Sequence, residues 1–186
     1  WFGTQDGLNR YDGKEFKVYH PQNNEGNKLP SNYISALHFD QTNKQLWIGT
    51  IRGTCLYDTA GDSLLLITEK YPYASVLLGV APKKIASFNQ DEFWIVSFNN
   101  GLLHINTKTK KITSYFNDAS NRARVTSITM LNGNIIVSLL NKLFWFEPQT
   151  SGYKTIPVME SHKFPEIREL YATDSTLWIG TITAGC

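Results

Sequence analysis

The stretch Leu46-Trp47-Ile48-Gly49-Thr50 decides the fold, because its last four residues recur along the chain. The motif returns as Trp1-Phe2-Gly3-Thr4 and Trp178-Ile179-Gly180-Thr181, and in degraded form as Trp94-Ile95-Val96-Ser97 and Ile135-Ile136-Val137-Ser138. The five anchors, Trp1, Trp47, Trp94, Ile135 and Trp178, are separated by 46, 47, 41 and 43 residues. A nearly constant interval of this size indicates a repeat architecture.

Each repeat also carries the signals of four short strands. A glycine follows the motif in the first three repeats (Gly7, Gly53 and Gly101), where a tight turn between two strands needs a positive φ. Lys142 occupies this slot in the fourth repeat and predicts a differently built turn there. Short stretches rich in β-branched and aromatic residues lie before and after each motif, and no segment keeps a helical apolar period over three turns. Four short strands per repeat are typical of a propeller blade.

We therefore expect an all-β fold in which residues 1–186 form a single partial β-propeller. It should contain about four blades of four antiparallel strands, cut within a blade at both ends, and we expect a larger, incomplete ring rather than a closed ring of four. The anchor Trp is expected on the second strand, buried between neighbouring blades. Gly3, Gly49 and Gly180 follow it and would allow close packing near the centre. A blade needs a neighbour on each side to bury its faces.

The composition excludes several classes of protein. A hydrophobic fraction of 41% argues for a packed core and against disorder. With 18 basic and 16 acidic residues, no strong field favours nucleic acid. The two cysteines, Cys55 and Cys186, form no CxxC motif and are expected to be free thiols. Because the chain opens on Trp1 without Met, we interpret it as a segment of a longer protein.

The second repeat resembles a known family. Leu46–Thr50 with Gly53 and Tyr57-Asp58, preceded by Leu29-Pro30-Ser31-Asn32-Tyr33-Ile34, is similar to the two-component regulator propeller repeat. The resemblance covers essentially the whole chain, although Val96-Ser97 replaces Gly-Thr in the third repeat and Ile135 replaces Trp in the fourth.

The resemblance implies the periplasmic sensor of a hybrid two-component system of Bacteroidetes, anchored in the inner membrane. Such a ring of blades would recognise glycan-derived oligosaccharides and be followed by a β-domain, a membrane helix, a histidine kinase and a transcriptional regulator. The implied partners are an oligosaccharide, the remaining blades and the β-domain of the same protein, with a homodimer as a further option. The kinase would lie outside this sequence.

The residues themselves predict no metal, cofactor or catalytic centre. The four histidines form neither HxH nor HExxH spacing, and no G-x-S-x-G is present. Most acidic residues occupy predicted turns, where local capping explains them. This segment is therefore not expected to be an enzyme.

The ligand is expected on one face of the ring. Loops from the second strand to the third, and from the fourth strand to the next blade, lie on that face. Ligand residues should be those that break the repeat, because a selective site is asymmetric. The candidates are Asn32, Tyr33, Arg52, Asn99, Asn100, Arg122, Arg124 and Arg168. They offer the donors, acceptors and aromatic surface that a saccharide needs, and the arginines favour an acidic or sulfated fragment.

Two other functions stay open from the residues. A passive protein-binding scaffold would be favoured by a flat apolar face, or by exposure of Leu64-Leu65-Leu66-Ile67, which we expect to include the outer strand of the second blade. A saccharide-acting propeller enzyme would be favoured by a pair of central carboxylates. Residues 71–82 form the longest insertion and predict a packed loop with a short helical turn.

Overall fold

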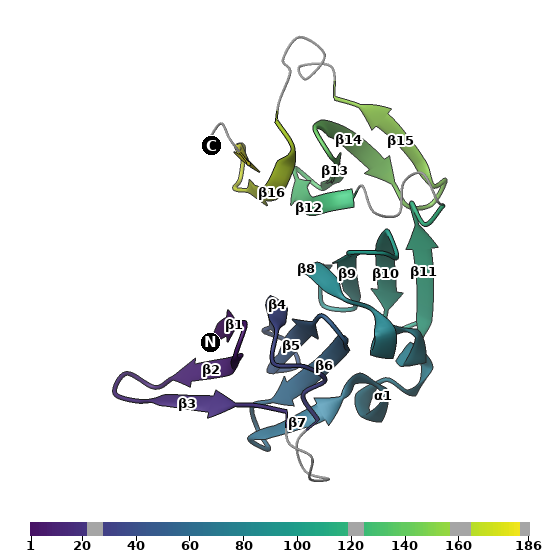
Figure 1. The fold of residues 1–186 in the computed structure, drawn as a ribbon. Coiled ribbons are helices and arrows are strands. Elements are labelled where there is room, and N and C mark those ends of the chain that lie inside the picture. The colour runs from purple at the N-terminus through teal and green to yellow at the C-terminus, as the bar shows by residue number, and fades with distance from the viewer. Residues whose placement is uncertain (22–27, 119–124, 157–164, 183–186) are drawn as a thin grey trace.

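The computed structural model describes residues 1–21, 28–118, 125–156 and 165–182. They form 17 strands in five antiparallel sheets, with two short helical segments. The sheets stand side by side around an open arc, and the first and last sheets face each other across its open side (Figure 1). The predicted all-β propeller fold is confirmed.

Three sheets are complete blades of four strands and two are partial. The first, partial sheet holds β1 (Phe2–Thr4), β2 (Gly7–Tyr11) and β3 (Phe16–Tyr19). The complete sheets hold β4 (Ile34–Asp40), β5 (Gln45–Thr50), β6 (Gly53–Asp58) and β7 (Ser63–Leu66); then β8 (Pro82–Asn89), β9 (Glu92–Ser97), β10 (Leu102–Asn106) and β11 (Lys111–Tyr115); then β12 (Val125–Leu131), β13 (Asn134–Leu139), β14 (Lys142–Glu147) and β15 (Gly152–Thr155). The last sheet holds β16 (Ile167–Ala172) and β17 (Leu177–Thr181).

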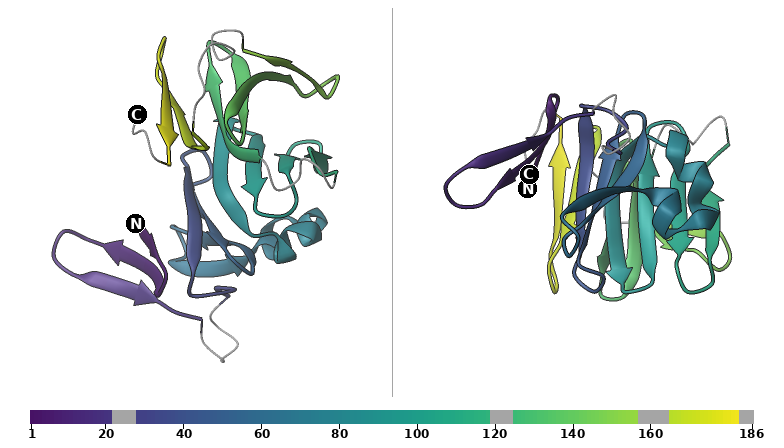
Figure 2. Two further views of the ribbon diagram at one scale, coloured as in Figure 1. Left: turned by 45° about the horizontal axis from the view of Figure 1, so that its top comes forward. Right: turned by 90° about the horizontal axis from the view of Figure 1, so that it is seen from below.

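The first strand of each blade lies on the inside of the arc. Strands β4, β8, β12 and β16 line the inner side, and β7, β11 and β15 lie outside (Figure 1). Seen from below, the blades stack as a row of nearly upright strands (Figure 2). In the three complete blades and in the last sheet the anchors lie on the second strand, at Trp47 on β5, Trp94 on β9, Ile135 on β13 and Trp178 on β17.

The anchors Trp47 and Trp94 pack against the following blade, whereas Ile135 is partly buried in the cluster of Trp94 and faces the preceding blade. In the fourth blade Ile136 takes the place of the anchor Trp, because it packs with Ile167 and Leu170 of the last sheet. The ring of Trp47 is fully buried and stacks on Phe93 of the next blade, with centroids 4.4 Å apart. Trp94 is buried in one cluster with residues of the fourth blade, among them Phe146. Trp178 departs from the expectation of burial and is 55% exposed, because no further blade covers it within the described residues.

The glycine after the anchor lets the next blade approach closely. A Cβ added at Gly3 would lie 2.7 Å from Cγ2 of Ile34, and one added at Gly49 would lie 2.8 Å from Cγ of Pro82. Ile34 and Pro82 are the first residues of the next inner strands. In the third blade Val96 takes this place and packs in one cluster with Val125, the first residue of β12.

The hydroxyl of the motif closes the turn that follows it. Thr50 Oγ1 donates to Gly53 O at 2.9 Å and accepts from the backbone N of Arg52 at 3.2 Å. The turn glycines have the expected positive φ, as at Gly53, where φ is 144°. In the fourth blade, Leu140 takes a φ of 52° ahead of Lys142, so this turn is built differently, as predicted.

The apolar segment at Leu64 is buried on two sides, since Leu64 packs in one cluster with Leu8 of the first sheet and Ile67 packs against the insertion that follows it. Leu64 and Ile67 are buried, and Ile67 packs with Tyr71 and Leu77. The covering residues lie in α1 (Ile67–Lys70) and the 3-10 helix η1 (Pro72–Gly79). The predicted packed loop with a helical turn is therefore present, and Leu64 and Ile67 present no exposed apolar surface to a partner.

We expect Gly49→Ala to lower the free energy of unfolding by about 1–3 kcal/mol, because the new methyl group would overlap Pro82. Denaturant unfolding of the chain measures the change. Gly180→Ala is the matched control, since a Cβ there would meet its nearest neighbour at an ordinary 3.6 Å. Equal losses in the two variants would contradict the packing argument.

Candidate functional site

All four described inner strands carry an irregularity at the same place. The pairing register of each strand shifts around its second residue. The residues skipped by the ladder are Ser35 on β4, Lys83 on β8, Thr126 on β12 and Arg168 on β16. A β-bulge leaves one residue unpaired and re-aims its side chain. We call these four the bulge residues.

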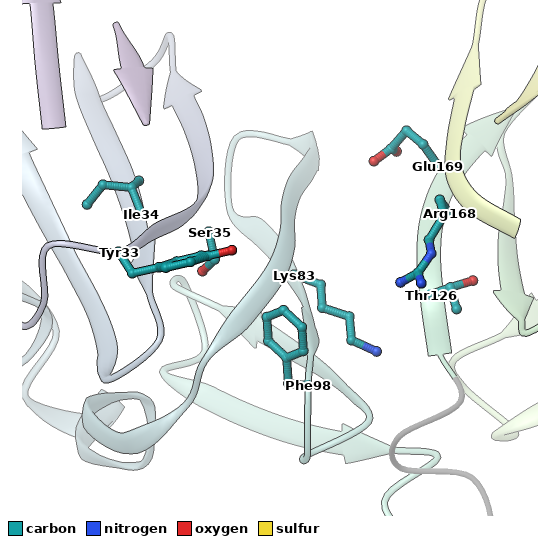
Figure 3. A pocket seen from close by; sticks show the side chains of 8 residues that line it. All are labelled: Tyr33, Ile34, Ser35, Lys83, Phe98, Thr126, Arg168 and Glu169. Carbon is teal, nitrogen blue, oxygen red and sulfur yellow. The ribbon is translucent and has the colours of Figure 1, made fainter. Parts of the chain in front are cut away.

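The bulge residues meet in one pocket at the inner side of the arc (Figure 3). It has a volume of about 250 Å³. Its walls come from the second, third, fourth and last sheets. The lining residues are Tyr33, Ile34, Ser35, Lys83, Phe98, Thr126, Arg168 and Glu169. The pocket thus combines two aromatic rings, two cations, two aliphatic hydroxyls and one carboxylate.

The two cations face one another across the pocket (Figure 3). Nζ of Lys83 donates to Val125 O at 3.2 Å and lies 5.3 Å from the centroid of the Phe98 ring. Burial lowers the pKa of Lys83 and the guanidinium of Arg168 lowers it further, while Glu166 opposes the shift. Arg168 Nη1 lies 3.6 Å from Glu166 Oε1, and its side chain is 63% exposed.

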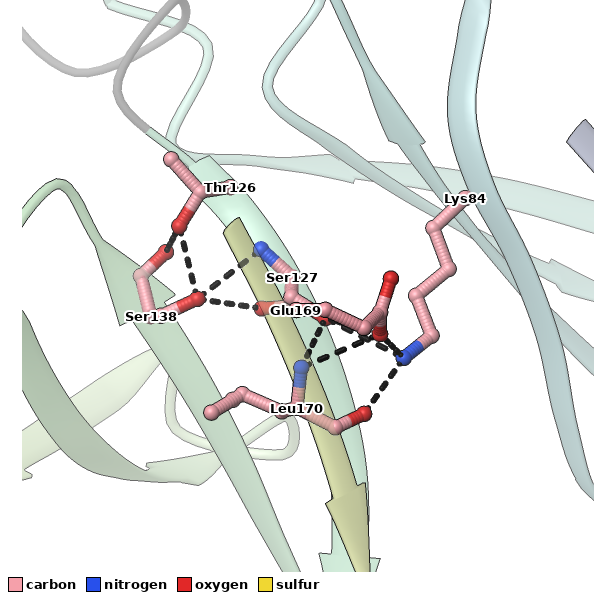
Figure 4. A network of polar contacts seen from close by, with 6 residues as sticks. All are labelled: Lys84, Thr126, Ser127, Ser138, Glu169 and Leu170. Atoms are coloured by element: carbon pink, nitrogen blue, oxygen red, sulfur yellow. Dashed lines mark hydrogen bonds and ion pairs between the residues drawn. The ribbon is translucent and has the colours of Figure 1, made fainter. Parts of the chain in front are cut away.

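A polar network beside the pocket ties three inner strands together (Figure 4). The ammonium of Lys84 on β8 donates to Ser127 Oγ of β12 at 3.1 Å and to Leu170 O of β16 at 2.7 Å, and forms an ion pair with Glu169. Ser127 Oγ donates to Glu169 Oε1 at 2.9 Å. The network holds Glu169, the one carboxylate among the described lining residues, and links three blades.

The same network continues into the fourth blade. Ser127 N donates to Ser138 Oγ at 2.9 Å, and Ser138 Oγ lies 2.8 Å from Thr126 Oγ1. The bulge residue Thr126 is therefore held by the serine of its own blade's degraded motif.

Two of the predicted ligand residues line this pocket. They are Tyr33 and Arg168. Arg52, Asn32, Asn99 and Asn100 do not line it, and Arg122 and Arg124 lie outside the described residues. Asn99 and Asn100 serve the turn after β9, where their backbone N atoms donate to Ser97 Oγ at 3.3 and 3.2 Å. A ligand-binding role for all eight stays a prediction.

The sequence reasoning missed most of the lining residues. The candidates predicted from the sequence do not include Ser35, Lys83, Phe98, Thr126 or Glu169. The four bulge residues share one feature of the sequence that could have revealed them. Each directly follows the apolar first residue of its inner strand, as in Ile34-Ser35 and Val125-Thr126.

The described residues hold no cluster of three or more potential metal ligands. His38 contacts Ser87 Oγ at 2.8 Å, and His104 stacks on Trp94 with centroids 4.1 Å apart, so both are structural strand residues. Cys55 is a buried free thiol whose pKa is raised by burial, and Cys186 lies outside the described residues. Within the described part of the chain, no helix is long and apolar enough to span a membrane.

The radial blades and their inner pocket define the class of this molecule, a β-propeller. Residues 28–52 match the family model described as two component regulator propeller. No curated protein matches the chain.

Solved structures share the fold. One, described as the extracellular domain of the hybrid two component system BT3049 of B. thetaiotaomicron, is 20% identical with a TM-score of 0.75, over 98% of this chain and 24% of that one. Another, the extracellular domain of the one component system BT4673 of B. thetaiotaomicron, is 19% identical with a TM-score of 0.74, over 97% and 25%. The WD40 β-propeller domain of Doa1 is 11% identical with a TM-score of 0.56, over 80% and 48%. The chain spans about a quarter of the length of the first two.

The charges in the pocket predict a linked titration. Arg168→Gln should raise the pKa of Lys83 toward its ordinary value, and Glu166→Gln should lower it, because the first change removes a repulsive charge and the second an attractive one. The ¹³Cε chemical shift of Lys83 followed against pH measures both. Since the folded-state pKa lies below the unfolded one, Lys83 deprotonation makes folding more favourable as pH rises between the two values. Shifts of the same sign in the two variants would contradict this electrostatic assignment.

Proposed function

We propose that the chain is part of the extracytoplasmic sensor of a hybrid two-component sensor kinase. It would recognise glycan-derived oligosaccharides in the periplasm and signal to the transcription of saccharide-utilisation genes. The observation that carries this proposal is the pocket lined by the bulge residues, at the inner side of a propeller with a two component regulator repeat. The similarity to extracellular domains of B. thetaiotaomicron systems supports the placement of the protein outside the cytoplasm.

The pocket has the surfaces that a sugar requires. Tyr33 and Phe98 are 40% and 42% exposed, so their rings are available to the apolar face of a sugar. Lys83 and Arg168 supply donors, and Glu169 supplies an acceptor. Binding sites of this kind combine aromatic walls with a few placed polar groups.

A glycosidase is less well supported by the same pocket. Such enzymes need two carboxyl groups flanking the scissile bond. Of the eight lining residues one is a carboxylate, Glu169, and it is held by Lys84 and Ser127. We therefore assign the pocket to binding.

A ligand in this pocket could produce a signal because the pocket is lined by residues from four sheets. A ligand in contact with β4, β8, β12 and β16 touches the inner strands of four sheets at once. It would stabilise the arrangement of blades that it fits, which is the way a ligand shifts an equilibrium between two conformations. The partners that receive this shift would be the remaining blades and the following β-domain of the same protein, in an inner-membrane-anchored chain that can pair as a homodimer.

Thermal unfolding of the complete extracellular domain that contains this chain, against a panel of neutral and acidic oligosaccharides, tests the proposal. A ligand at 100 times its dissociation constant should stabilise the native state by about 2.7 kcal/mol. The expected result is an increase in Tm of a few degrees with one class of glycan.

The variant Phe98→Ala should abolish the increase while changing the unliganded Tm little, because the ring is on the surface. Tyr11→Ala is the matched control, since Tyr11 is 48% exposed on the first sheet and does not line the pocket. A panel without any shift would argue against saccharide sensing and favour a protein-binding propeller.

A further inference from the structure

The four bulge residues differ in chemistry, although each occupies the same position in its inner strand. The residue before each of them is apolar and buried: Ile34, Pro82, Val125 and Ile167. The bulge residues themselves are Ser, Lys, Thr and Arg. A residue at a bulge is left out of the ladder and its side chain is re-aimed. The four positions therefore determine much of the chemistry of the pocket, with Thr126 also buried and bonded to Ser138 of its own blade.

The lining residues present two cations and one carboxylate to the pocket. Lys83 and Arg168 both point into the pocket (Figure 3), and the one lining carboxylate, Glu169, is already paired with Lys84. Glu166 lies 3.6 Å from Arg168, but Arg168 remains 63% exposed. Two cationic groups that line one small pocket favour an anionic ligand, although Glu166 already offsets part of their charge.

The remaining walls suit a sugar ring attached to that anion. The rings of Tyr33 and Phe98 lie on the side of the pocket away from Arg168 (Figure 3). Ser35 Oγ is buried and has no hydrogen-bond partner within the described residues, so rotation about χ1 would offer it to a ligand hydroxyl. The volume of about 250 Å³ is below the roughly 300–1,000 Å³ of sites for drug-sized ligands, so the pocket fits one sugar unit better than a whole oligosaccharide.

We propose that this pocket binds the acidic terminal residue of a saccharide, with its carboxylate or sulfate group between Lys83 and Arg168 and its ring against Tyr33 and Phe98. The proposal deepens the sensor function and rests on it for the saccharide, whereas the anion site rests on the two cations alone. Arg168 offers a planar fork of donors to the anion and Lys83 a point charge, a combination suited to either oxyanion.

Calorimetric titration of the complete extracellular domain tests the anion and the sugar separately. The probes are methyl β-glucuronide, glucose 6-sulfate, methyl β-glucoside and inorganic sulfate. We expect one of the two acidic sugars to bind at least about tenfold more tightly than the neutral glucoside, since a charge-assisted hydrogen bond contributes roughly that factor or more. The tighter of the two identifies the oxyanion.

Variants then locate the site. Arg168→Gln and Lys83→Gln should each weaken the preferred acidic sugar about tenfold to hundredfold and leave the neutral glucoside unchanged. Lys83→Arg should retain most of the affinity, because it keeps the charge. Lys154→Gln is the matched control, as this exposed lysine lies on the outer strand β15. The Tm of each unliganded variant confirms that it is folded.

The outcomes separate the two levels of the proposal. If acidic and neutral sugars bind equally, or if Arg168→Gln and Lys83→Gln behave like Lys154→Gln, the anion site is wrong while saccharide sensing stands. If inorganic sulfate binds as tightly as the sugars and is lost in both variants, the anion site stands and the saccharide is wrong. If no probe binds, both the anion site and the sugar pocket are overturned.

Discussion

Neighbouring blades of this propeller meet at one tight contact, where the second strand of a blade touches the first residue of the next inner strand. At Gly49 the gap is so small that an added Cβ would lie 2.8 Å from Pro82, and the same holds between Gly3 and Ile34. This contact fixes where each inner strand begins. Because the bulge comes one residue later, the contact also fixes where its side chain emerges. The geometry of the pocket therefore depends on the packing of Gly49, which does not line it.

Polar side chains near the bulges require hydrogen-bond partners, and the polar network supplies them. Side chains released from the ladder bring charge and hydroxyl groups toward the centre of the ring, where solvent is partly excluded. Lys84, Ser127 and Glu169 satisfy one another through hydrogen bonds and an ion pair that cross three blades. Such networks are worth most when every member is satisfied. A hydrogen-bonded polar network across three blades therefore lies immediately beside the pocket.

Much of this fold could be predicted from the repeat. The turn glycines and the exception at Lys142 correspond to turns of the structure, because they meet local requirements of a hairpin. The nearly constant interval between anchors corresponds to the succession of four-stranded blades. The pocket could not be predicted in the same way. A bulge shifts the alternation of a strand by one residue, so a period of two assigns Lys83 and Thr126 to the wrong face. The bulge residues also lie 12, 11, 9 and 10 residues before their anchors, since the hairpins differ in length, and no fixed spacing reveals them.

The position of the bulge has a consequence for how such proteins diverge. Each of the four inner strands contributes one bulge residue to the pocket lining, from a backbone that is held by its own ladder. A single codon change at Ser35, Lys83 or Arg168 would alter the chemistry of the pocket while the paired residues of the blade stay the same, whereas Thr126 is buried and bonded to Ser138. If the pocket binds a ligand, duplicated genes could in this way change its specificity by independent steps, one blade at a time.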